Sequence, residues 1–339
     1  MNQHKDKAWS ILPESARQLV KEDYKVFSEA VTKAIDTSGI ESQEQLCAIP
    51  ASQHVSMAAQ CTEVTRPFIL KDLDGDIILA YYPNRIPQSL AETANKDFKK
   101  IMRRQFSGNL EPPKNDLSHR DIDPKKLTER YGDRNFGTIR CACWFEEGKP
   151  TTTEDGVPLI NRDMCNGSTA FDRHTRLIQV LTPIKGVISD VFAAASPVKW
   201  RNLVNSCSRL EKYVPSTQCL FRQQKHAAWS SFSLVVNLPT FIHMDNKNAQ
   251  RGLTGMCSVG SPCGMWLVIF SAGLKFRLNP EDLVLFNSAR LPHFIHRTES
   301  GKQHAVVSFF NHERVLAWVS EKHENRRKAA QRTTELARE

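Results

Sequence analysis

The stretch Phe232–Leu238 reads FSLVVNL and is rich in the aromatic and β-branched residues that favour β-strands. Three more runs of this kind follow it along the chain: Met265–Phe270, Leu283–Phe286 and Ala305–Phe310. Gly, Pro, Asn or Asp residues separate each run from the next, without an intervening helical pattern. Short strands at this spacing predict an antiparallel β-sandwich or jelly roll in the C-terminal third of the chain.

Three stretches on the N-terminal side of this β-rich region have the residue spacing of helices. Apolar residues recur among charged ones from Pro13 to Ile35 and from Pro87 to Phe106, as in amphipathic helices. Helical signals between residues 176 and 210 are broken at Pro183 and Pro197, because proline lacks the N–H that a helix interior needs. We therefore expect helices beside the β-rich region.

A β-hairpin is expected at Pro67–Tyr82, where two apolar runs flank an Asp- and Gly-rich turn. No Gly-, Ser- or Pro-rich linker divides the chain, so residues 1–220 are expected to pack on the β-rich core and not to form a separable domain. The predicted fold class is α+β. A jelly-roll core occupies residues 221–320, with the helices and the hairpin packed around it, and residues 321–339 form a charged tail.

The composition favours a basic, intracellular protein of 339 residues. The formal net charge is +9 and the pI is near 9.1, a balance that favours polyanions such as nucleic acid. No run approaches the roughly 20 apolar residues that span a bilayer, so no membrane association is expected. The first residues lack the apolar core of a secretory signal, and the nine cysteines are odd in number. Both observations favour a nuclear or cytoplasmic location.

A candidate metal site is formed by His243, Asp245 and His293. The first two residues stand two apart, so on an extended strand both side chains leave the same face. His293 lies 48 residues beyond Asp245, and in a jelly roll such distant strands face each other across the barrel mouth. Two imidazoles and one carboxylate are the ligand set of non-haem Fe(II) oxygenases, which keep open positions for O2 and an organic co-substrate. His119 and Asp121 have the same spacing, but their polar surroundings predict a loop.

Other chemistry has little support in the sequence. No Walker A, Gly-x-Ser-x-Gly or dinucleotide-binding motif is present, which removes the commonest NTPase, hydrolase and dehydrogenase interpretations. Cys141 and Cys143 lie in a predicted strand, Thr138–Phe145, and lack the second pair that a structural zinc site needs. We expect them to be buried or strand-edge thiols.

With these residues in place, the sequence resembles the 2-oxoglutarate/Fe(II)-dependent dioxygenases, whose double-stranded β-helix is a jelly roll with His-x-Asp early and His late. Members of that superfamily carry a Gly eight residues after the distal His and a basic residue ten after it, which grips the far carboxylate of 2-oxoglutarate. Here Gly301 occupies the first position and Gln303 the second. A neutral amide cannot form the charge-assisted pair, so either Lys302, His304 or Arg297 substitutes, which we favour, or the co-substrate differs from 2-oxoglutarate.

More narrowly, the stretch from Ser233 to Phe310 looks like the fungal branch of the ten-eleven translocation (TET) and J-binding-protein group, oxygenases of methylated pyrimidines in nucleic acid. The resemblance rests on framing residues such as Val236-Asn237 before the His-x-Asp pair and Leu291–Ile295 around the distal His. It implies Asn237 as a further candidate at the co-substrate site.

The resemblance implies that His243, Asp245 and His293 hold Fe(II), with 2-oxoglutarate and O2 as co-substrates for hydroxylation of a C–H bond. A methylated base of DNA or RNA would have to leave the stack to reach the iron. Phosphate contacts are expected from the basic face of the helix predicted at Pro87–Phe106: Lys96, Lys99, Lys100, Arg103 and Arg104. The alternatives are a hydroxylase of a protein side chain or small molecule, and a degenerate oxygenase fold that acts as a binding module.

Overall fold

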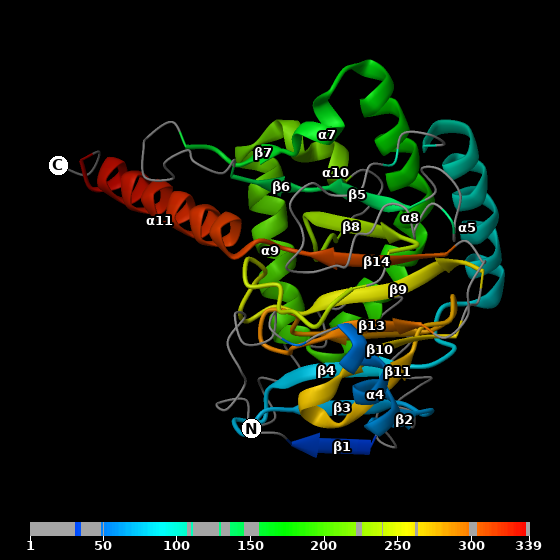
Figure 1. The fold of residues 1–339 in the computed structure, drawn as a ribbon. Helices are drawn as coiled ribbons and strands as arrows, with labels where there is room; N and C mark the ends of the chain where they lie inside the picture. The colour runs from blue at the N-terminus through cyan, green and yellow to red at the C-terminus, as the bar shows by residue number, and fades with distance from the viewer. Residues whose placement is uncertain are drawn as a thin grey trace.

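We describe the protein from a computed structural model, in which the described residues are 31–34, 49, 51–106, 110, 129, 136–145, 156–221, 226–238, 240–261, 264–297 and 304–336. They form a mixture of helices and large antiparallel sheets, as the sequence predicts (Figure 1). The larger sheet holds, in spatial order, β1 (Val31–Ala34), β3 (Phe68–Lys71), β4 (Ile77–Tyr82), β12 (Leu283–Phe286), β9 (Thr254–Gly260), β14 (His304–Phe310), β8 (Ser231–Val236) and β5 (Gly137–Cys141). The smaller sheet holds β13 (Phe294–Arg297), β10 (Met265–Ile269), β11 (Leu274–Arg277) and β2 (Thr62–Val64).

From β8 to β14 the chain passes back and forth between the two sheets. Strands β8, β9, β12 and β14 belong to the larger sheet, whereas β10, β11 and β13 belong to the smaller one. Side chains alternate along each strand, so Val284 of β12 and Val306 of β14 enter the apolar core between the sheets. Their neighbours Leu285 and Val307 enter a second core on the other side of the larger sheet.

Helices cover that other side. The second core is shared with α5 (Gln88–Ile101), α8 (Ser168–Ala195) and α9 (Pro197–Tyr213), which lie behind the larger sheet in Figure 1. The approach of α8 is close at Gly255 of β9, where an added Cβ would lie 2.8 Å from Ile188 and 3.0 Å from Trp229. Only glycine fits this position without displacing a neighbour.

Helix α8 corrects one prediction, because it runs unbroken through Pro183. One missing backbone hydrogen bond is outweighed by the burial of apolar side chains such as Leu181, Ile184 and Ile188 against the sheet. The predicted break at Pro197 is confirmed, since this residue begins α9. Among the described helices, α8 is the one long and apolar enough to cross a bilayer, but its apolar residues form the core of this fold. The expectation of no membrane association stays a prediction.

The N-terminal elements confirm the hairpin, which forms from β3 and β4, and the helix at Pro87–Phe106, where α5 continues into a π-helical turn, Met102–Phe106. The predicted helix Pro13–Ile35 is wrong at its end, because β1 is a strand that pairs in parallel with β3. The free edge of β3 supplies hydrogen-bond partners that the local apolar pattern does not reveal. The rest of that stretch lies outside the described residues.

The C-terminal helix α11 (Glu313–Leu336) begins well before the predicted tail boundary at residue 321. It leaves the body of the protein and carries the chain outward (Figure 1). Short strands β6 (Cys143–Trp144) and β7 (Leu159–Ile160) form a two-stranded ribbon beside its first half. The division at residues 220 and 320 stays a prediction.

Candidate metal centre

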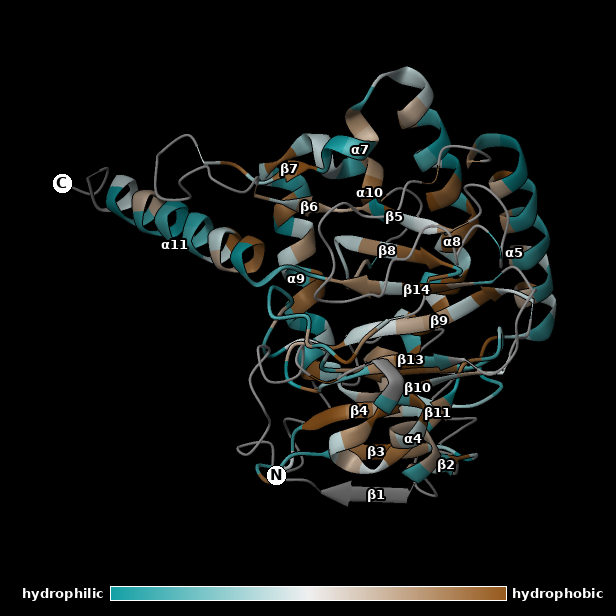
Figure 2. Ribbon diagram, in the orientation of Figure 1, coloured by the Kyte–Doolittle hydropathy of each residue, from teal (hydrophilic) through white to brown (hydrophobic). Residues whose placement is uncertain are grey.

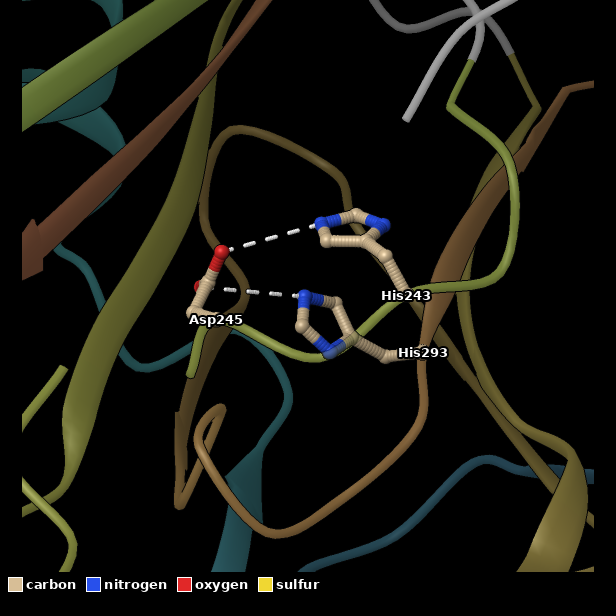
Figure 3. Close-up of side chains that lie close together, drawn as sticks. All are labelled: His243, Asp245 and His293. Atoms are coloured by element: carbon tan, nitrogen blue, oxygen red, sulfur yellow. Dashed lines mark ion pairs between the residues drawn. The ribbon is translucent and has the colours of Figure 1, made fainter. Parts of the chain in front are cut away.

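His243 and His293 lie directly opposite each other in an isolated antiparallel bridge. The N–H of His243 donates to the carbonyl of His293 at 3.0 Å, and the reverse bond measures 2.9 Å. The sequence suggested an extended strand through His243 and Asp245. In the structure His243 is instead a single paired residue beside β13 and not part of a continuous strand. The two imidazole centroids lie 4.4 Å apart, and both side chains turn toward Asp245 (Figure 3).

Backbone carbonyls fix the orientation of both imidazoles. Nδ1 of His243 lies 2.7 Å from the carbonyl oxygen of Phe241, and Nδ1 of His293 lies 2.9 Å from that of Leu291. A carbonyl only accepts, so each Nδ1 carries the hydrogen and each Nε2 keeps its lone pair. The ring of Phe286 meets the ring of His293 edge to face at 4.8 Å. Both Nε2 atoms are thus prepared as metal ligands.

Asp245 is held in place by the turn that follows it and by the loop before His293. Its N–H donates to the carbonyl of Ser288 at 2.9 Å, and its Oδ2 accepts from Nδ2 of Asn248 at 3.2 Å. Asn248 also donates to Oγ of Ser288 at 3.0 Å, and that hydroxyl lies 2.8 Å from Oγ1 of Thr254. This network orients the carboxylate toward the imidazoles, while 33% of the side chain stays accessible. Solvent and substrate therefore have access to the site from the Asp245 side.

The donor set fits one divalent metal ion. Nε2 of His243 lies 3.8 Å from Oδ1 of Asp245, and Nε2 of His293 lies 4.0 Å from Oδ2. Ligands at about 2.1 Å from one ion are separated by about 3 Å at a right angle and about 4.2 Å when opposite. Among the described residues, this is the one group of three or more His, Cys, Asp or Glu side chains placed close enough to share an ion.

The residues suggested for the co-substrate are less completely described. Asn237 follows β8 with φ of 52°, and its Oδ1 accepts the N–H of His304 at 3.2 Å. His304 begins β14 and is buried. Arg297 ends β13 and pairs with Met265, which belongs to the core between the sheets. Lys302 and Gln303 lie outside the described residues, as do His119 and Asp121.

The structure adds residues that the sequence did not indicate, above all His312. An isolated bridge joins His312 to Asn248 and so places it beside the loop of Asp245. Rings of Trp144 and Phe310 flank its imidazole, with centroids at 5.7 and 5.2 Å. Burial lowers the pKa of His312 to about 4, although the charge of Asp245 acts in the opposite direction. At neutral pH the imidazole is uncharged.

The predicted thiols are confirmed as buried groups. Cys141 and Cys143 are fully enclosed, and burial raises the pKa of Cys143 to about 12. Neither therefore offers a thiolate near neutral pH.

Among solved structures, the chain is similar to NgTET1 in complex with 5mC DNA. The TM-score is 0.54 at 14% sequence identity, and the match covers 90% of this chain and 93% of that one. The chain has the fold of that structure. Structures of a prolyl hydroxylase from Trichoplax adhaerens and a prolyl-4-hydroxylase from Pseudomonas putida, both 12% identical, match at TM-scores of 0.35 and 0.31. These matches cover 80% and 68% of this chain and 98% and 91% of those structures. No family model and no curated protein sequence matches.

The resemblance inferred from the framing residues is confirmed in the fold, since the TET structure matches over nearly the whole chain and not only over Ser233–Phe310. At this sequence identity the likeness concerns architecture. What the site does must be argued from its own residues.

Proposed function

We propose that this protein is an Fe(II)- and 2-oxoglutarate-dependent dioxygenase that hydroxylates a C–H bond of a methylated base in nucleic acid. The observation that carries the proposal is the convergence of His243, Asp245 and His293 at a jelly-roll mouth. Beside the loop of Asp245 lies His312, whose Nε2 has no hydrogen-bond partner among the described residues and whose ring neighbours are Trp144 and Phe310. The TET fold, described for a protein in complex with 5mC DNA, supports the choice of substrate class.

The iron would be held by Nε2 of His243, Nε2 of His293 and one oxygen of Asp245. When bound, it supplies activation of O2 coupled to decarboxylation of 2-oxoglutarate. The protein's own contribution is geometric. The paired backbones of the two histidines hold both imidazoles beside Asp245, and the three residues would supply three ligands and leave the remaining positions to co-substrates.

The far carboxylate of 2-oxoglutarate needs a cation or several strong donors once it is buried. Arg297 ends β13, the strand that begins directly after His293, and so lies four residues from that ligand along the chain. We propose that Arg297 takes the role that the superfamily gives to the residue at position 303. His304, which directly follows position 303 in the sequence, begins β14, and its N–H donates to Oδ1 of Asn237 after β8.

The substrate base would bind beside His312, next to the loop of Asp245. Nδ1 of His312 lies 3.3 Å from the carbonyl oxygen of Lys247, to which it donates, so Nε2 is an acceptor. This Nε2 is buried and has no hydrogen-bond partner among the described residues. The exocyclic amino group of a cytosine or adenine is the complementary donor, and Trp144 and Phe310 offer ring faces and edges for stacking. A base that reaches His312 must first be flipped out of its helix.

Turnover on a substrate panel tests the proposal. The purified protein, loaded anaerobically with Fe(II), should form succinate from 2-oxoglutarate faster with DNA or RNA that contains methylated bases than with unmethylated controls, and mass spectrometry should show the hydroxylated base. Stimulation by peptides or free metabolites alone would favour the protein or small-molecule hydroxylase. If the protein neither binds iron nor turns over 2-oxoglutarate, the remaining interpretation is a degenerate oxygenase fold that acts as a binding module.

A further inference from the structure

Helix α11 starts at the metal centre and ends far from it. The N–H of Glu313 donates to the carbonyl of Lys247 at 3.0 Å, and Oε2 of Glu313 accepts from the N–H of Gln250 at 2.8 Å. Both partners belong to the loop that follows Asp245. The first turn of the helix is therefore fixed to the candidate site, and the other turns project from the body (Figure 1).

Only the first half of α11 packs on the protein. Val315 and Val319 are buried, and the last contacts are made with Tyr213 of α9. The hydroxyl of Tyr213 lies 3.0 Å from Nδ1 of His323, and the guanidinium of Arg326 lies 4.5 Å above the ring. Beyond this point the helix is hydrophilic, as Figure 2 shows, and residues 325–334 are exposed. Contacts with the rest of the chain therefore do not account for the projection of the outer turns into solvent.

The outer turns carry an excess of positive charge. Residues 325–334 hold four cations and no carboxylate: Arg326, Arg327, Lys328 and Arg332. Among the residues whose side chains the structure describes, Glu324 is their acidic partner, at 3.0 Å from Arg327 and 3.9 Å from Lys328. The last turn of α11 contains no basic residue, so stabilisation of the helix dipole does not account for these cations.

We infer that the outer half of α11 is an arm that binds the phosphate backbone of duplex nucleic acid and delivers it to the metal centre. The inference rests on the proposed function for its ligand. Charge complementarity selects a polyanion, and within residues 325–334 the most apolar residues are Ala329 and Ala330, which gives this segment no face that could enter a lipid surface. The helix begins at the loop of Asp245, so a duplex bound along it lies at the mouth of the site.

The basic face of α5, which the sequence suggested for phosphate contacts, is placed less favourably. Asn95 of α5 accepts the N–H of Gly260, at the end of β9 opposite to Thr254. Thr254 is the β9 residue that is hydrogen-bonded to Ser288 beside the metal centre, about 20 Å away along the strand. Figure 1 shows α5 and α11 at opposite sides of the molecule. The structure thus assigns the phosphate contacts to α11.

The test compares two variants that lose the same charge. In the arm variant, Arg327→Gln, Lys328→Gln and Arg332→Gln are combined. In the control, Lys99→Gln, Lys100→Gln and Arg103→Gln are combined on α5 and its π-helical continuation. Gln is a good helix former, so both helices should persist, which circular dichroism checks. The measured quantity is the affinity for duplex DNA with 5-methylcytosine, over a range of salt concentrations.

The arm variant should flatten the slope of log affinity against log salt by about 2.7 and weaken binding by roughly two orders of magnitude at 0.1 M salt. The control should change neither. An unchanged slope in the arm variant, or equal losses in both variants, overturns the assignment. Turnover of a methylated dinucleotide, too short to reach the arm, should be equal in wild type and arm variant. If the slope falls as expected but no methylated base is oxidised by the wild type, the arm stands and the proposed reaction fails.

Discussion

His243 and His293 exchange both of their backbone hydrogen bonds, although they are 50 positions apart in the chain. Their separation is therefore set by strand pairing and not by side-chain packing alone. Because the main chain fixes the two imidazoles before any ion binds, the site should be largely formed in the metal-free protein. Such preorganisation lowers the conformational cost of metal binding.

Removal of a ligand from this set should abolish Fe(II) binding. Asp245→Ala and His293→Ala each leave two ligands, which is too few to hold the ion at one iron per chain. His296→Ala is the matched control, because its ring lies 6.1 Å from that of Trp266 on the other face of β13. Iron content after anaerobic loading and desalting measures the effect. Full iron content in His293→Ala would remove this residue from the site.

The hydrogen-bond network behind Asp245 should matter nearly as much. Asn248→Ala removes the donor to Oδ2 and should weaken Fe(II) binding by roughly 10- to 100-fold, as for other groups that orient metal ligands. Asn246→Ala changes an exposed neighbour in the same loop and should have little effect. Competition with a chelator gives both affinities. Similar affinities for the two variants would show that Asp245 needs no support from Asn248.

His312→Phe should separate substrate binding from iron chemistry. Phenylalanine keeps a ring between Trp144 and Phe310 but lacks the acceptor Nε2, so KM for the methylated substrate should rise by roughly tenfold or more. Iron content and the slow decarboxylation of 2-oxoglutarate without substrate should persist. His54→Phe is the control, since His54 is another buried imidazole, stacked on Phe294 at 4.9 Å. A rise in KM for 2-oxoglutarate instead would place His312 on the co-substrate.

Arg297→Ala should raise the KM for 2-oxoglutarate, because a buried carboxylate without its cation costs several kcal/mol. The matched control is Arg277→Ala on β11, where the guanidinium is paired with Glu63 at 3.0 Å. Steady-state kinetics with varied 2-oxoglutarate distinguish the two. If Arg297→Ala has an ordinary KM, His304→Ala and Lys302→Ala become the variants to measure.

Lys185 should make stability depend on pH. Burial in the core between α8 and β5 lowers its pKa from 10.5 to about 8. The unfolded chain therefore holds the proton more tightly, and the free energy of unfolding should rise between pH 8 and 10.5 by up to about 3 kcal/mol. Lys185→Met should remove this rise and stabilise the protein at pH 7, whereas Lys185→Arg should destabilise it. Denaturant unfolding at several pH values measures both, and a flat profile for the wild type would contradict the shift.

The metal ligands could be predicted because their signal is local: His243 and Asp245 are two residues apart, and His293 lies between two evident strands. Residues such as Asn248 and His312 could not, because a bridge between distant segments brings them to the site and neither carries a motif. Strand β9 escaped prediction for a related reason. It contains Gly255, which the close approach of α8 requires and which weakens the β-pattern in the sequence.

Tyr81 and Tyr82 are neighbours on β4, yet their side chains enter different cores, one between the two sheets and one under the helices. Strand β4, from the N-terminal half of the chain, thus contributes side chains to both hydrophobic cores. A shift of β4 would disturb both cores together, so a destabilising substitution in the core under the helices should also affect the loop that carries Asp245. The loop that carries Asp245 would then depend for its shape on residues far from the three candidate metal ligands, so a substitution in the helical core should weaken metal binding as well as stability.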